Sequence, residues 1–166
     1  MAGESSAASF NFCSSWTLDV PRQVVWEAVT DFYSWSDWWP GLEEIVETDP
    51  GGEDGIGQKA SSRWRGPIGY LFRFSIVSVE RREPEILKGL ASGDLSGTGT
   101  WTLAERGDGT DVRLNWDVHA NRKWMEFLAP VARPVFVHGH DHVMKAGANG
   151  LAGHLGVELR DFTSTS

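Results

Sequence analysis

The residues best suited to chemistry lie near the C-terminus, where the sequence HGHDH occupies positions 138–142. His138 and His142 lie one helical turn apart, so their imidazoles could share a cation. On helical spacing both face away from the apolar side, and His154 lies about 21 Å beyond His140 at 1.5 Å per residue. No third ligand is evident nearby. We therefore expect no metal site, and nothing in the sequence calls for a cofactor.

His140 differs from its neighbours, because helical spacing places it near the middle of the apolar side of the same segment. An imidazole in an apolar setting can hydrogen-bond a ligand oxygen or move a proton near neutral pH. The alternative is a core histidine held by a backbone carbonyl or a buried carboxylate. Asp141 points about 100° away from His140 around a helix, so we do not assign it as the catalytic partner of His140.

The helix that carries these histidines is predicted over residues 134–156. A stripe roughly 120° wide would face the core. It contains Phe136, His140, Val143, Met144, Gly147, Leu151 and Leu155. On the opposite face Asp141 and Lys145 can pair one turn apart. Gly147, Gly150 and Gly153 each cost about 1 kcal/mol against alanine in a helix, which indicates close packing against another surface or space beside the helix.

The rest of the chain reads as a strand, two short helices and a series of strands. Alternation predicts a strand over 11–19, a helix starts at Val20 and Pro21, and Ser34 can cap a second helix that ends before Pro40. Strands follow at 44–48, 56–65, 70–81, 85–93, 97–105 and 110–120, and their short connections predict antiparallel hairpins. A short helix through residues 124–128 is then predicted, with prolines 130 and 134 kinking or restarting the chain.

Composition limits the function classes. The chain has 166 residues and a formal net charge of −8, which argues against binding nucleic acid or anionic membranes non-specifically. Cys13 is the one cysteine, so no internal disulfide or thiolate metal site is expected. No apolar run is long enough to span a bilayer, and the first residues do not resemble a signal peptide. We expect a cytoplasmic protein without integral membrane association.

One domain is predicted, because neither a repeat nor a low-complexity linker divides the chain. We place a mobile N-terminal tail at residues 1–8, the domain at 9–158 and a C-terminal tail at 159–166. The nine tryptophans are the unusual feature of the composition, since so many large rings are difficult to pack closely without leaving a void.

The order of these elements carries a family resemblance, together with two motifs. They are VPxxVVWEAVTDF at residues 20–32 with WWPG at 38–41, and HDxVMKxGxxGL at residues 140–151. The chain resembles the START-related superfamily, also called SRPBCC, and within it the bacterial polyketide cyclase/dehydrase and lipid-transport group. The resemblance covers roughly residues 10–156 and implies an α+β helix-grip fold. In that fold a curved antiparallel sheet wraps around a long C-terminal helix, with two short helices after the first strand and an apolar cavity between sheet and helix.

The resemblance also implies which residues contact a ligand. The mouth of the cavity would lie between the WSDWWPG loop and the WMEF segment, and the glycines of the helix would leave cavity volume. The expected ligand-binding residues are Trp38, Trp39, Trp64, Tyr70, Phe72, Phe74, Trp101, Trp116, Trp124, His140, Met144, Gly147 and Leu151. Any one of these aromatic residues can instead be ordinary core.

Three functions agree with this sequence. The first is a binding or carrier protein for a hydrophobic or aromatic small molecule, lipid-like or polyketide-like, acting as a monomer or homodimer. The second is a polyketide cyclase, aromatase or dehydratase that uses His140 as acid or base, with Tyr70 as a weaker donor. The third is a protein-interaction module with a filled core. Its exposed contacts would be Trp35, Trp38, Trp39 and Trp124.

Overall fold

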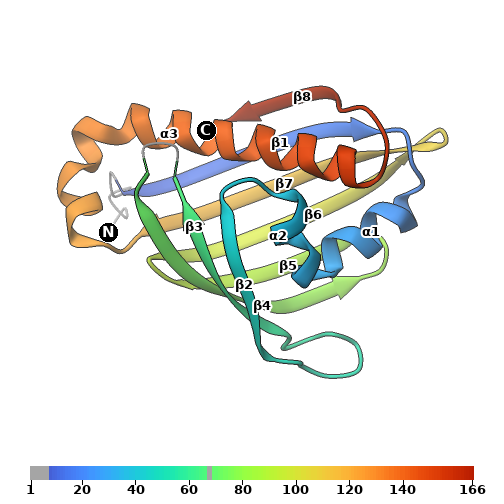
Figure 1. Cartoon of the computed structure of the whole chain (residues 1–166), viewed down its shortest axis with the longest axis horizontal. Coiled ribbons are helices and arrows are strands. Elements are labelled where there is room, and N and C mark those ends of the chain that lie inside the picture. Colours follow the sequence, from blue (N-terminus) through green and yellow to red (C-terminus); the bar gives the residue numbers. More distant parts are fainter. Residues whose placement is uncertain (1–7, 67–68) are drawn as a thin grey trace, which may run out of the picture.

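The computed structural model describes residues 8–66 and 69–166, which form a curved antiparallel sheet with a long helix across its concave face (Figure 1). The strands are β1 (Ser9–Leu18), β2 (Leu42–Asp49), β3 (Lys59–Arg65), β4 (Leu71–Arg82), β5 (Ile86–Gly93), β6 (Leu95–Arg106), β7 (Gly109–Ala120) and β8 (Arg160–Thr165). The helices are α1 (Arg22–Thr30), the short 3₁₀ helix η1 (Phe32–Ser34), α2 (Trp35–Trp38) and α3 (Lys123–His154). This is the α+β helix-grip fold predicted from the sequence.

The sheet consists of consecutive hairpins from β2 to β7, followed by β1 and then by β8 at the edge. Its order is β2-β3-β4-β5-β6-β7-β1-β8, with every neighbouring pair antiparallel. Alternation decides the buried face, since Phe12, Ser14 and Trp16 of β1 are buried and lie beside Trp116, Leu114 and Val112 of β7. All seven strands predicted upstream of the long helix are present.

The C-terminal segment differs from its prediction, which was a tail at 159–166. Residues 160–165 form β8, which pairs with β1 in a register that places Cys13 opposite Thr165. The ring centroids of Phe162 and Trp16 lie 6.1 Å apart. The strand was missed because it is short and largely polar, so its alternation gives a weak signal. Ala8, assigned to the N-terminal tail, is buried, and residues 1–7 lie outside the described residues.

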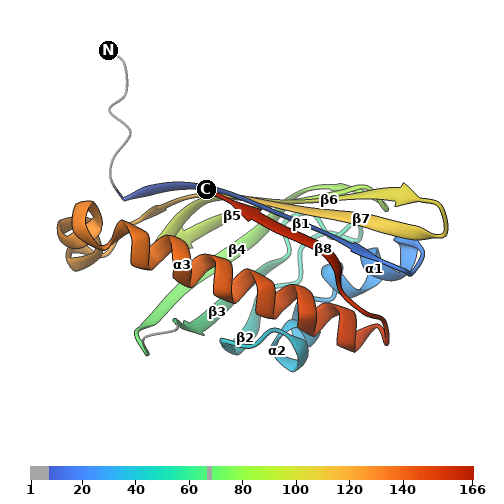
Figure 2. The same cartoon turned by 90° about the horizontal axis from the view of Figure 1, so that it is seen from above.

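The long helix also differs from its prediction. A short helix at 124–128 and a separate one from 134 were expected, but α3 is continuous from Lys123 to His154 with Pro130 and Pro134 inside it. Its ribbon bends near the N-terminal end (Figures 1 and 2), as expected where proline removes a backbone donor and crowds the preceding turn. The predicted inward stripe is confirmed, since Phe136, Met144, Gly147 and Leu151 are buried.

Two glycines of α3 serve close packing. A Cβ atom at Gly147 would collide with the indole of Trp39, and one at Gly150 would collide with the backbone carbonyl of Trp38. At Gly153 a Cβ atom would meet nothing within 4 Å. The glycines therefore let the segment after α1 seat against the helix, and the expectation that they leave cavity volume is wrong for Gly147 and Gly150.

This packing predicts opposite effects at two nearby glycines. Gly150→Ala forces a side chain against backbone, so we expect it to lower the free energy of unfolding by about 2 kcal/mol. Gly153→Ala occupies open space in the same helix, so it should raise the free energy of unfolding by roughly 0.5–1 kcal/mol. Urea denaturation followed by tryptophan fluorescence measures both. A Gly150→Ala protein as stable as Gly153→Ala would contradict the packing described.

Candidate functional site

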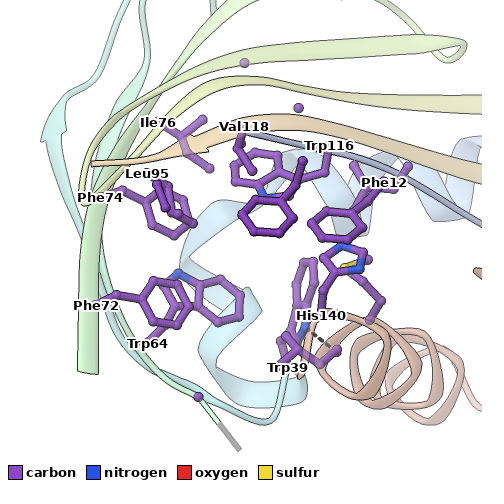
Figure 3. Close-up of a pocket in the computed structure, with 18 of the residues that line it drawn as sticks. Phe12, Trp39, Trp64, Phe72, Phe74, Ile76, Leu95, Trp116, Val118 and His140 are labelled. Atoms are coloured by element: carbon purple, nitrogen blue, oxygen red, sulfur yellow. Dashed lines mark hydrogen bonds between the residues drawn. The ribbon is translucent and has the colours of Figure 1, made fainter. Parts of the chain in front are cut away.

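A cavity lies between the concave face of the sheet and α3. It contains about 160 Å³ of space that the centre of a water molecule can occupy. One water needs about 10–15 Å³ by that measure, so the cavity has room for roughly ten waters or a small organic molecule. The residues around it come mostly from β3 to β7, from β1 and from α3 (Figure 3). The core is therefore hollow, which contradicts the filled core of an interaction module.

One wall of the cavity is a group of stacked rings. The planes of Trp64, Phe72 and Phe74 are within 9° of parallel, with ring centroids 6.0–6.4 Å apart. They come from adjacent strands, because Trp64 of β3 lies directly opposite Phe72 of β4. Trp39 meets the ring of Trp64 edge-on at 5.2 Å between centroids. Flat rigid rings in this arrangement form a surface suited to another flat molecule.

Trp39 also anchors this wall to α3. Its Nε1 donates a hydrogen bond of 3.1 Å to the backbone carbonyl of Val143. On the sheet side, Trp116 lies over Gly99, where a Cβ atom would be 2.7 Å from the indole ring. Gly99 thus lets the ring of Trp116 lie close to the sheet. The shape of the cavity depends on this contact and on the contact between Gly147 and Trp39.

His140 is the titratable side chain of α3 that borders this cavity. Its ring stacks on Phe12 of β1, with centroids 3.6 Å apart and planes 8° from parallel. Both ring nitrogens are fully buried, and neither has a hydrogen-bond partner in the described part of the chain. Figure 3 shows the two rings together, across the pocket from Trp64, Phe72 and Phe74. His140 therefore borders the cavity while both of its nitrogens have unmet hydrogen-bonding capacity.

Burial lowers the pKa of His140 from the ordinary value of 6.5 to about 4, and the Asp141 carboxylate offsets part of this shift. Oδ1 of Asp141 lies 3.5 Å from Nδ1 of His140, which is too long for a good hydrogen bond but close enough for a charge effect. From helical spacing alone, these two side chains were expected to point about 100° apart around the helix. At pH 7 the imidazole is neutral, so it can accept a hydrogen bond or a proton.

The other polar groups at the cavity are few. The pKa of the Tyr70 hydroxyl is raised by burial. The hydroxyl of Ser78 accepts a hydrogen bond of 3.2 Å from Nε of Arg81. The indole nitrogen of Trp35 is buried without a hydrogen-bond partner in the described residues. The site is therefore apolar and aromatic, with a small number of polar contacts.

A family model described as polyketide cyclase / dehydrase and lipid transport matches residues 9–156. The chain belongs to this family. Its fold is that of the START-like superfamily, also called SRPBCC, as the motifs at residues 20–41 and 140–151 indicated. No protein with a curated description matches the chain.

Solved structures share this fold at low sequence identity. The di-domain ARO/CYC BexL from the BE-7585A biosynthetic pathway matches at a TM-score of 0.74 and 18% identity, over 93% of this chain and 52% of that one. The Zhui aromatase/cyclase from Streptomyces sp. R1128 matches at a TM-score of 0.73 and 16% identity, over 88% of this chain and 93% of that one. A START superfamily protein from Mycobacterium smegmatis matches at a TM-score of 0.72 and 16% identity, over 89% of this chain and 98% of that one. The chain spans about half the length of the di-domain proteins it matches.

The structure brings together most of the residues predicted to contact a ligand. Those at the cavity are Trp39, Trp64, Tyr70, Phe72, Phe74, Trp101, Trp116, His140 and Met144. Four predicted residues lie elsewhere. Leu151 is fully enclosed in the core, and Gly147 is covered by the indole of Trp39. Trp38 stacks on the far side of Trp39, and Trp124 meets Tyr70 and Phe136 edge-on while remaining partly exposed.

Sequence reasoning missed other cavity residues. Phe12 belonged to the predicted inward face of its strand, and Trp35 to the predicted short helix, but neither was assigned to the cavity. Gly139 and Ser78 are small and gave no signal. Period-2 alternation in β1 was the available signal for Phe12. It could not show that this part of β1 lies against His140, because that contact depends on where α3 crosses the sheet.

Of the four tryptophans that the interaction-module hypothesis expected to be exposed, only Trp124 is exposed, and the prediction is wrong for the other three. Trp35, Trp38 and Trp39 are each only 6% exposed, because they pack into the core beside α3. Exposed apolar side chains occur instead on the first half of α3, at Phe127 and Val131 among others. Within the residues that the structure describes, no group of three His, Cys, Asp or Glu side chains could hold a metal, and no helix is long and apolar enough to cross a membrane.

Burial of His140 predicts a loss of stability in acid. The unfolded chain takes up a proton at the imidazole as pH falls below 6.5, whereas the folded chain does so only near pH 4. Protonation therefore favours the unfolded state, and this group should make the protein about 2 kcal/mol less stable at pH 5 than at pH 7. Urea denaturation at both pH values measures the difference.

The matched variants for this test are His140→Phe and His138→Phe. His140→Phe removes the buried imidazole, so its loss of stability between pH 7 and pH 5 should be about 2 kcal/mol smaller than that of the unaltered chain. His138 is exposed on the opposite face of α3, and His138→Phe should retain the full loss. An unchanged pH dependence in His140→Phe would show that another group causes the acid sensitivity.

Proposed function

We propose that this protein binds a hydrophobic, aromatic small molecule in the cavity between the sheet and α3. The observation that carries the proposal is the hollow core, about 160 Å³ of open space walled by stacked aromatic rings. An empty apolar cavity forfeits dispersion contacts that a bound molecule restores. Walls made of Trp64, Phe72 and Phe74 favour flat ligands over branched ones.

Entry of the ligand is proposed near the start of α3. The cavity lining reaches Gly66 and Tyr70 beside the β3–β4 connection, and Met125 in the first turn of α3. Trp124 and Leu71, both partly exposed, lie in the same two segments. At the opposite end the cavity is lined by Phe32, Trp35 and Trp39, from η1, α2 and the residue after α2. Figure 1 shows α2 near the C-terminal half of α3. We therefore propose that the ligand enters between Tyr70 and the first turn of α3.

A cavity-filling substitution tests the proposed binding. Val118 lines the cavity from β7, so Val118→Phe places a ring in the open space, and we expect at least a tenfold loss of affinity for 2-naphthol. Val46 is half exposed on β2 and does not line the cavity, which makes Val46→Phe the matched control. Isothermal titration calorimetry measures both. Equal affinity in the two variants would place the binding outside the cavity.

The class of natural ligand is best approached with the protein as purified. Native mass spectrometry without detergent, followed by organic extraction, identifies any molecule that leaves on unfolding. We expect a stoichiometric lipid-like or polyketide-like compound with an aromatic or extended apolar body. A clean apo mass that persists after incubation with a panel of apolar aromatic compounds would contradict the proposal.

A second candidate function is catalysis of the cyclase, aromatase or dehydratase type on a bound poly-carbonyl chain. The observation that favours it is the neutral, unpartnered imidazole of His140 at the cavity wall, which can remove a proton next to a carbonyl. Solved relatives described as aromatase/cyclases share the fold. The cavity would hold the chain in a bent form that brings its reacting carbons together.

His140→Ala separates binding from catalysis. If the protein is a carrier, the variant should bind its ligand with nearly unchanged affinity, because the aromatic walls are intact. If the protein is an enzyme, turnover of a poly-carbonyl substrate should fall by about 10²–10⁴-fold while binding persists. Product formation measured by mass spectrometry distinguishes the two. Full turnover in His140→Ala would exclude His140 as the catalytic base.

A further inference from the structure

Exposed apolar side chains gather on one side of the first half of α3. Eleven large apolar side chains are exposed in the described part of the chain, and five of them lie between residues 124 and 135. These five form what we call the outward ridge: Trp124, Phe127, Leu128, Val131 and Val135. Phe127 and Val131 are each 83% exposed. Isolated apolar side chains on a surface are ordinary, whereas a contiguous group of them marks a surface that contacts a partner.

The same side of α3 carries no carboxylate. At 100° per residue the ridge continues toward the C-terminus as a stripe through His138, His142 and Lys145, which are all exposed. Glu126 and Asp141 lie roughly 80° or more from the centre of this stripe by the same spacing. The chain has 23 acidic residues and a formal net charge of −8. An exposed stripe of this length without an acidic residue is therefore complementary to a negatively charged partner.

Trp124 connects the outward ridge to the cavity. Its ring meets the rings of Tyr70 and Phe136 edge-on, at 6.0 and 6.4 Å between centroids. Tyr70 and Phe136 line the cavity, whereas Trp124 is 38% exposed. Leu71, the residue after Tyr70, is 37% exposed. Rings in contact therefore lead from the cavity lining to the exposed ridge, at the proposed point of ligand entry.

The size and position of the outward ridge favour a lipid surface over a second copy of the chain. Residues 124–135 span about 18 Å at 1.5 Å per residue, and a helix with its side chains is about 10 Å wide. A stable dimer buries about 800 Å² on each partner, several times the footprint of this ridge. Figures 1 and 2 show this end of α3 projecting past the ends of the strands, so the ridge is convex. A bilayer needs no matching hollow, and it takes the apolar side chains of an interfacial helix about 5–10 Å deep.

We propose that the outward ridge docks this protein on the surface of an anionic lipid bilayer. Phe127 and Val131 enter the boundary between headgroups and acyl chains, and Lys145, farther along the stripe, faces the lipid phosphates. The net charge of −8 repels the other sides of the molecule from such a surface, so it fixes the orientation of the docked protein. The point of ligand entry then faces the lipid. Uptake of a ligand from the bilayer rests on the proposed function, whereas docking does not.

Flotation with lipid vesicles tests the docking. We expect the unaltered protein to float at pH 7 with vesicles made of equal parts of phosphatidylcholine and phosphatidylglycerol. Phe127→Ser/Val131→Ser should bind these vesicles at least tenfold more weakly, because it loses apolar area that the bilayer buries. Both side chains are exposed, so the variant should fold normally. The matched control is Val46→Ser/Leu90→Ser, which changes two exposed apolar residues of the sheet and should float like the unaltered protein.

A second pair of variants tests the contribution of charge. Lys145→Glu places a carboxylate on the stripe and should weaken binding to the same vesicles about tenfold, because the reversal removes one attraction and adds one repulsion. Lys59→Glu makes the same change at an exposed position of β3 and should leave binding unchanged. Binding to vesicles of phosphatidylcholine alone should not respond to either change. Equal losses in the two lysine variants would show that net charge governs binding, and not the stripe.

The outcomes separate docking from the cavity function. No flotation of the unaltered protein, or equal flotation of Phe127→Ser/Val131→Ser, would overturn the docking. A dimer in analytical ultracentrifugation that this variant converts to monomer, without vesicle binding by the unaltered protein, would assign the ridge to a second copy of the chain and also overturn it. The ridge variant lies outside the cavity lining, so its affinity for 2-naphthol should be unchanged. An unaltered protein that floats but does not bind 2-naphthol would leave the docking standing and contradict the cavity function.

Discussion

The cavity depends on the contact between Trp39 and α3. The indole lies where any side chain at Gly147 would collide with it, and its Nε1 donates to the backbone carbonyl of Val143. Gly150 admits the carbonyl of Trp38 in the same way. Glycine thus brings the helix close to the chain at one end, where α2 lies (Figure 2). Elsewhere along the helix, large rings on the sheet separate α3 from the strands and leave the space between them open.

The open space persists because its walls support one another. Trp64, Phe72 and Phe74 stack with nearly parallel planes, so no ring can tilt into the cavity without losing contact with its neighbour. His140 is held in the same manner by Phe12. The structure therefore tolerates both a void and an unpartnered imidazole in its core, each of which lowers stability. A bound aromatic molecule would offset the cost of the void, and this connects the fold to the proposed function.

Periodicity predicted the parts of this structure that follow from local geometry. Alternation placed Phe72 and Phe74 on the inward face, and helical spacing placed His140 and Met144 on the inward stripe. It failed where a residue's direction does not reveal what lies opposite. Leu151 points inward like Met144 but meets core, because α3 extends past the end of the cavity. The break predicted at the prolines was also wrong, since a helix held on both sides of a bend can continue through it.

The sequence by itself determined the order of elements, the buried face of each and the family, because these depend on spacing along one segment or on motifs within it. Only the tertiary structure decided which rings surround the cavity, how close Asp141 lies to His140, and that β8 completes the sheet. Those features arise between residues distant in the chain, such as Ser164 against Ser14 and Phe12 against His140. The distances between them are set by how α3 crosses the sheet, and no local pattern in the chain contains that information.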